Sequence, residues 1–150
     1  MLEFHEKFAE IIYNSSHEGV VIIWKDFTTD EEFMKVYENA LYLAREIPCK
    51  CWIEEMGKGK TVPSASVEWV VNGFFAKLAT TEIRKVAFLI EHNFMRNIYA
   101  EAIIESVKMA GLQVKSFNTR HEMELWIKEG KSTLPDFTRG SMNNEFNQYY

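Results

Sequence analysis

The chain has 150 residues with a formal net charge of −5, and 47% of its residues are hydrophobic. This length predicts one domain, and the composition is typical of a globular protein rather than a disordered one. The negative charge argues against a general nucleic-acid-binding protein, which needs lysines and arginines to neutralise phosphates, and against docking on an anionic membrane.

Two strand-like runs come first in the chain. Residues 8–13 and 20–25 are rich in β-branched and aromatic side chains, and residues 14–19 between them are typical of a turn. We therefore expect a β-hairpin. No apolar run approaches the ~20 residues that span a bilayer, and the first residues lack the pattern of a signal peptide. The sequence predicts a cytoplasmic protein without membrane insertion.

Helix-patterned and strand-patterned segments then alternate. The first helix is expected to begin at Thr28 or Thr29, because a glutamate follows each by three residues, as in a capping box. Phe33, Tyr37 and Leu41 lie on its apolar face, and Pro48 ends it. The later expected elements are a strand at 49–56, a helix from Pro63 or Ser64 with Val67, Val70, Val71, Phe74 and Leu78 on its apolar face, a strand at 84–90, a helix at 94–110 with Gly111 after it, a strand at 113–117, and a helix that Thr119 caps and Gly130 stops.

Strands separated by helix-length connections lie parallel. The order therefore predicts an α/β domain over residues 1–130, with about five strands in a mixed sheet, an N-terminal hairpin, parallel strand–helix units and about four helices. Residues 131–150 change character, and we expect a C-terminal tail that is poorly ordered or docked on a partner. Cys49 and Cys51 are expected as small apolar residues on one face of a strand, because no further ligands at fitting spacing suggest a metal.

Three stretches, at 21–33, 83–90 and 115–127, carry a resemblance to a known fold. The chain resembles the STAS-like fold of anti-sigma-factor antagonists, and more closely the small bacterial STAS-like proteins related to the lipid-binding CRAL-TRIO fold. The resemblance implies a regulatory or protein-interaction role, and the CRAL-TRIO relation implies a lipid-like ligand. Many members of this group have no assigned activity, and no cofactor is expected.

One departure concerns phosphorylation. Antagonist-type members carry a phosphorylatable serine in a turn between the third strand and the second helix, and that turn is missing here. Thr61, Ser64 and Ser66 are the hydroxyl residues of the region, and Ser64 is expected to act as a helix N-cap. The resemblance therefore does not carry a phosphorylation site over to this chain.

Residues 57–61 read Gly-Lys-Gly-Lys-Thr, which matches the end of a phosphate-binding loop. The first glycine of that motif would fall at position 54, where a glutamate stands, and Pro63 lies where the helix should already be running. We expect a solvated loop rather than a nucleotide site.

Ligands of parallel sheets bind beyond the carboxyl ends of the strands. Glu54, His92 and Asn118 are therefore the polar candidates for a site, although a loop histidine is more often structural. Glu54 and Glu55 should point to opposite faces of their strand, one exposed and the other capping or in a salt bridge. No serine or cysteine is recognisably paired with a histidine, so the sequence favours a protein that is not an enzyme.

The chain has 4 tryptophans and 11 phenylalanines, which suit a core, an interface or an apolar pocket. The first hypothesis is a non-enzymatic interaction module. It predicts an exposed patch at Trp69 and Phe75 that binds a regulatory protein or makes a homodimer, and no buried polar cluster. The second is a carrier or sensor of a small apolar ligand, with an enclosed cavity lined by Phe74, Phe75, Leu78 and Met95. An enzyme would instead need titratable groups that converge around Glu54, His92 and Asn118.

Overall fold

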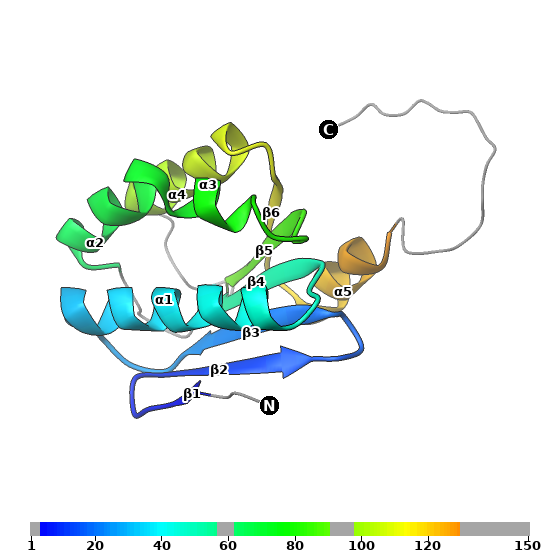
Figure 1. Ribbon diagram of the computed structural model, residues 1–150, viewed down its shortest axis with the longest axis horizontal. Coiled ribbons are helices and arrows are strands. Elements are labelled where there is room, and N and C mark those ends of the chain that lie inside the picture. The colour runs from blue at the N-terminus through cyan, green and yellow to red at the C-terminus, as the bar shows by residue number, and fades with distance from the viewer. Residues whose placement is uncertain (1–3, 57–61, 91–97, 130–150) are drawn as a thin grey trace.

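The computed structural model describes residues 4–56, 62–90 and 98–129. They form an α/β domain, as the order of elements predicted (Figure 1). The elements in chain order are β1 (Phe4–His5), β2 (Ala9–Asn14), β3 (Gly19–Trp24), α1 (Asp30–Glu46), β4 (Cys51–Met56), α2 (Ser64–Trp69), the π-helical turn η1 (Val70–Phe74), α3 (Phe75–Leu78), β5 (Lys85–Ile90), α4 (Ile98–Met109), β6 (Gln113–Phe117) and α5 (Arg120–Lys128).

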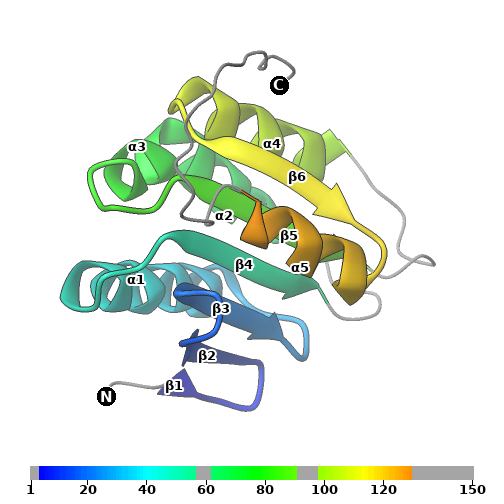
Figure 2. The ribbon, with the colours of Figure 1, turned by 90° about the vertical axis from the view of Figure 1, so that its right-hand side faces the viewer.

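The strands make one mixed sheet in the order β1-β2-β3-β4-β5-β6. β1, β2 and β3 pair antiparallel, which confirms the N-terminal hairpin and adds a two-residue strand that the sequence pattern missed. β3, β4, β5 and β6 pair parallel, as expected for strands joined by helical connections. Figure 2 shows β6 at one edge of this sheet and β1 at the other.

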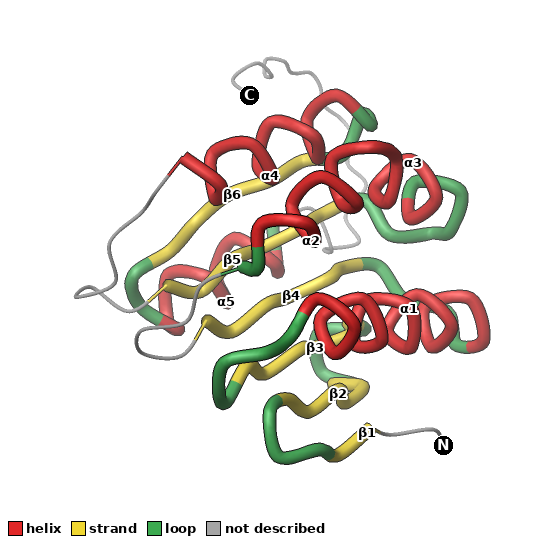
Figure 3. Tube along the Cα trace, turned by 90° about the vertical axis from the view of Figure 1, so that its left-hand side faces the viewer, coloured by secondary structure: helices red, strands yellow, loops and turns green. Residues whose placement is uncertain are grey.

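Helices cover both faces of the sheet. α1, α2, α3 and α4 lie on one face, and α5 lies on the other (Figure 3). The larger core, under the first group, includes Trp52, Val86 and Val107, and the smaller core, under α5, includes Ile53 and Ala87. Neighbouring residues of β4 and β5 thus point to different cores, as strand pleating requires. Within the described residues, no helix is long and apolar enough to span a bilayer.

The predicted caps of the first and last helices are present. Thr29 forms a full capping box with Glu32: the Thr29 hydroxyl accepts from the Glu32 backbone N–H, and the Glu32 carboxylate accepts from that of Thr29. Thr119 accepts a hydrogen bond from the backbone N–H of Glu122 at the start of α5. Gly111, after α4, has a φ of 85°, the left-handed conformation that glycine adopts without strain.

The second helix differs from its predicted pattern. A regular α-helix would place Val71 and Phe75 on one face, four residues apart. Instead η1 widens the helix and Gly73 takes a φ of 141°, so the residues that follow are rotated about the axis. Phe75 is consequently only 1% exposed, while Val71, before Gly73, is 41% exposed. The predicted apolar face was wrong at Val71, and Phe75 belongs to the core.

Cys49 and Cys51 are free buried cysteines, as expected, but they do not share a face. β4 begins only at Cys51, so the strand alternation does not extend back to Cys49. Cys49 lies in the larger core and Cys51 in the smaller one. A Cβ atom on Gly19 of β3 would lie 2.6 Å from Cys51 Sγ, so this close approach of β3 and β4 requires a glycine.

Candidate functional site

Glu54 is the most unusual residue of the described structure. It lies in the middle of the sheet on β4, directly between Ile22 of β3 and Phe88 of β5, and only 2% of it is exposed. Because side chains two apart on a strand share a face, Glu54 points with Trp52 toward the larger core under α1. The expectation that Glu54 and Glu55 point to opposite faces holds, but Glu54 is neither exposed nor a cap.

Three side-chain donors surround the Glu54 carboxyl group. Its Oε1 accepts a hydrogen bond of 3.0 Å from the indole N–H of Trp24 on β3. Its Oε2 accepts one of 2.9 Å from the indole N–H of Trp52 and one of 2.5 Å from the hydroxyl of Tyr37 on α1. One buried carboxyl group therefore ties together two strands and a helix.

Burial raises the pKa of Glu54, because a charged carboxylate loses its hydration there, and the hydrogen bonds from Trp52, Tyr37 and Trp24 oppose this effect. Burial also raises the pKa of Tyr37 well above its usual value, and the nearby Glu54 carboxyl group adds to the shift. With its oxygens enclosed by neutral donors, Glu54 does not reach a solute in this conformation. Its role in the described structure is to position three aromatic side chains.

Aromatic rings enclose this network. Trp24 stacks on Phe33 with ring centroids 4.9 Å apart, and the Tyr37 ring lies 4.7 Å from Phe74. Trp69 contacts both Tyr37 and Phe74 through its ring, at 6.3 Å and 5.6 Å. The first hypothesis predicted no buried polar cluster, and that prediction was wrong. The sequence analysis placed Tyr37 only on an apolar helix face, so it missed Tyr37 as a partner of Glu54.

The other polar candidates do not join Glu54. Asn118 is exposed at the end of β6, and His92 lies outside the described residues. At this end of the sheet the structure instead pairs Glu55 with Arg120 at the start of α5, through two hydrogen bonds of 2.7 Å and 3.0 Å. Glu55 is therefore the carboxylate in a salt bridge, and it raises the pKa of Arg120.

The predicted exposed patch at Trp69 and Phe75 does not form. Phe75 is buried, and Trp69 is half-buried with its ring against Tyr37 and Phe74. Phe74 and Leu78 are also core residues, and Met95 lies outside the described residues. Of the four residues predicted to line the cavity, Phe75 lines an open groove instead.

An open apolar groove lies nearby, between the η1–α3 segment and α4. Its volume is about 430 Å³. Val71 and Met109 are exposed at this groove, at 41% and 81%, so two large apolar side chains lie around one hollow. Its other lining residues are mostly small or apolar and include Gly73, Phe75, Ala76, Ala102 and Ala110. The sequence analysis missed this groove because the regular helical period placed Val71 on the buried face, and the widened turn at η1 has no periodic signal.

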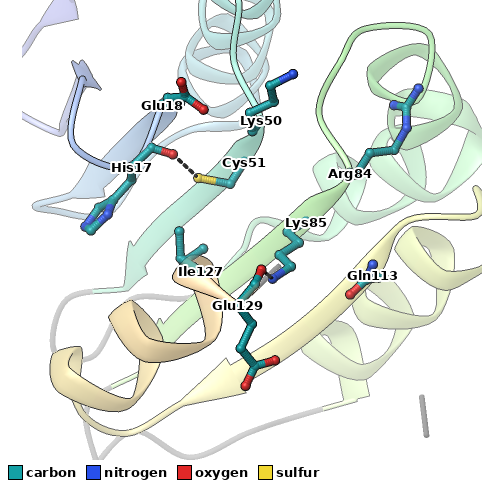
Figure 4. Close-up of a pocket in the computed structure, with 9 residues that line it drawn as sticks. All are labelled: His17, Glu18, Lys50, Cys51, Arg84, Lys85, Gln113, Ile127 and Glu129. Carbon is teal, nitrogen blue, oxygen red and sulfur yellow. Dashed lines mark hydrogen bonds between the residues drawn. The ribbon is translucent and has the colours of Figure 1, made fainter. Parts of the chain in front are cut away.

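A second hollow lies at the amino ends of the parallel strands, where Cys51, Lys85 and Gln113 begin β4, β5 and β6 (Figure 4). Its volume is about 330 Å³. The Cys51 thiol donates to the backbone carbonyl of His17, and Lys85 Nζ donates to the last carbonyls of α5, at Trp126 and Glu129. These contacts hold the β2–β3 turn and the end of α5 to the sheet, which is a structural role.

Two of the hydroxyl residues in the 61–66 region, Ser64 and Ser66, lie in α2. Ser64 is the first residue of α2 and Pro63 takes the N-cap position, so Ser64 is not the cap. Ser66 is fully buried, and both its backbone N–H and its hydroxyl donate to Asp30 Oδ1, at 2.8 Å and 2.7 Å. A phosphate on Ser66 would meet this carboxylate, so the folded structure opposes modification there. Thr61 lies outside the described residues.

Among the described residues, no group of three or more histidine, cysteine, aspartate or glutamate side chains could hold a metal ion. Comparisons of the chain with protein-family models, with curated proteins and with solved structures found no match.

Proposed function

We propose that this protein is a non-enzymatic, STAS-like interaction module that binds through the groove between η1–α3 and α4. The observation that carries the proposal is the pair of large apolar side chains exposed there, Val71 and Met109. Exposed apolar residues that gather around a hollow often mark an interaction surface. The mixed sheet, with its hairpin and parallel strand–helix units, supports the STAS-like part of the proposal.

The partner that this surface suits best is a second copy of the chain. A two-fold dimer uses the same patch on both subunits, so the patch must complement itself. The groove offers a hollow lined by Gly73 and Ala76 next to the projecting Met109 side chain, which is 81% exposed. Met109 of each copy would fill the hollow of the other. Methionine adapts well to such a site because its side chain is flexible and polarisable.

Native mass spectrometry over a dilution series tests the proposal. We expect a dimer that dissociates on dilution. Met109→Glu places a charge at the interface and should weaken the dimer roughly tenfold or more. Leu125→Glu is the matched control, because Leu125 is 55% exposed on α5, on the opposite face of the sheet. A monomer at every concentration, or a dimer that Met109→Glu leaves intact, would contradict the proposal.

A second function has one observation in its favour. The groove's apolar lining and its volume of about 430 Å³ also suit a small apolar ligand, since such sites commonly hold 300–1,000 Å³. In the carrier or sensor hypothesis, the ligand would therefore bind in this open groove rather than in an enclosed cavity. An apolar molecule retained by the purified wild-type protein and lost from Met109→Glu would favour the carrier over the dimer.

A further inference from the structure

β6 is an edge strand of the sheet that the structure describes. Within the described residues, β6 pairs only with β5, and it forms one edge of the sheet (Figure 2). The other edge is β1, whose two residues offer little backbone for pairing. Short edge strands protect a sheet against unwanted pairing. β6 has five residues in unbroken register with β5, from Lys85↔Gln113 to Leu89↔Phe117, and lacks that protection.

The backbone of β6 shows which groups face outward. The backbone N–H of Gln113 donates to the carbonyl of Arg84, at the side of β5. In a parallel pair, alternate residues direct their backbone groups to the same neighbour. Gln113, Lys115 and Phe117 therefore face β5, and the N–H and C=O groups of Val114 and Ser116 face the open edge. An added strand would pair with these groups.

A hollow of about 1,020 Å³ lies along this edge. Leu112, Val114 and Trp126 supply apolar walls, and Lys108, Lys115 and Glu129 supply charges. Two lysines against one glutamate give the edge a positive charge, although the whole chain carries −5. Backbone pairing would give an incoming strand its affinity, and the apolar walls and lysines would select its side chains.

We propose that the β6 edge binds an extended, acidic segment of a partner protein as an additional strand. A second copy of the chain is disfavoured at this edge in the symmetric register centred on the strand. Antiparallel pairing of two β6 strands about a two-fold axis at the middle residue would place Lys115 directly opposite Lys115, and like charges in that position are destabilising. A glutamate or aspartate opposite Lys115 would be attracted. This surface is separate from the groove between η1–α3 and α4.

The test uses the full chain and three fluorescent nine-residue peptides. The first alternates valine and glutamate, the second alternates valine and lysine, and the third is the first with a methyl group on every backbone nitrogen. We expect saturable binding of the glutamate peptide by fluorescence anisotropy at low ionic strength. The lysine peptide and the methylated peptide should each bind at least about tenfold more weakly, because one lacks the charge and the other cannot donate its backbone hydrogen bonds.

Two variants and one control variant test whether the peptide binds at β6. Lys115→Glu should reverse the preference, so that the lysine peptide binds better than the glutamate peptide. Lys77→Glu on α3 changes the net charge equally and should leave the preference unchanged. Ser116→Pro removes an outward N–H and should weaken binding of the glutamate peptide. No saturable binding, equal binding of the methylated peptide, or a preference that Lys115→Glu does not alter would overturn the proposal.

Discussion

Replacing Glu54 by glutamine removes one of two acceptor oxygens from the buried network. The indole nitrogens of Trp24 and Trp52 are donors only, and they donate to different oxygens of Glu54. A glutamine amide has one oxygen, so one indole N–H must face an NH₂ group. A buried donor without a partner costs about 1–3 kcal/mol. We expect Glu54→Gln to lower the free energy of unfolding by about this amount, measured by urea unfolding followed by circular dichroism.

A double-mutant cycle tests this reasoning. Trp24→Phe removes one of the two indole N–H donors. In the double variant, the single glutamine oxygen can accept the hydrogen bond from Trp52, and the glutamine NH₂ group faces the new phenyl ring. Glu54→Gln should therefore cost at least about 1 kcal/mol less in the Trp24→Phe protein than in the wild type. Costs that simply add would refute the hydrogen-bond argument, because they would show that Glu54 acts independently of Trp24.

The cost of Glu54→Gln should also depend on pH. Burial raises the pKa of Glu54, so the folded state holds this proton more tightly than the unfolded state does. The resulting stabilisation is fully present below the unfolded pKa and is lost as the pH rises through the folded pKa. The glutamine variant lacks this contribution. Its deficit relative to the wild type should therefore be larger at about pH 5 than at about pH 8. A deficit that grows with rising pH would contradict a raised pKa for Glu54.

Two further predictions concern the scaffold. Gly19→Ala should lower the free energy of unfolding by about 1–3 kcal/mol, because the new Cβ would lie 2.6 Å from Cys51 Sγ. Adding Cys51→Ala should recover part of that loss, and a neutral Gly19→Ala in thermal unfolding would contradict the close approach. Thr29→Ala should cost about 1 kcal/mol by removing the cap of α1. Glu32→Gln should cost less, since glutamine also completes a capping box, and equal losses in urea unfolding would count against the assignment.

Features with a local cause could be predicted from the sequence. A glutamate three residues on predicted Thr119 as one cap and either Thr28 or Thr29 as the other, and Thr29 and Thr119 accept the expected hydrogen bonds. The central strands followed from their β-branched runs, and their parallel order followed from the helices between them. The two-residue strand β1 has no such run, so it could not be recognised before its pairing with β2 was known.

Features with a tertiary cause could not be predicted in the same way. Val71 faces outward, and the widened turn at η1 rotates Phe75 inward, against the regular helical period. Glu54 is buried because Trp24, Tyr37 and Trp52 converge on it from three different elements. One signal was present: Glu54 follows Trp52 by two residues on a strand, so both had to share a face. A glutamate on the face of a buried tryptophan predicts a hydrogen-bonded carboxyl group.

The central claim is that the groove between η1–α3 and α4 is a binding surface. Carbon-13 methyl NMR of the methionines over a dilution series tests it most directly, because it reports on Met109 itself. Met123 is the internal control, since it lies on the buried side of α5 and is only 1% exposed. The account predicts that the Met109 signal shifts with protein concentration while the Met123 signal stays fixed. A Met109 signal that does not change while the protein self-associates would contradict it.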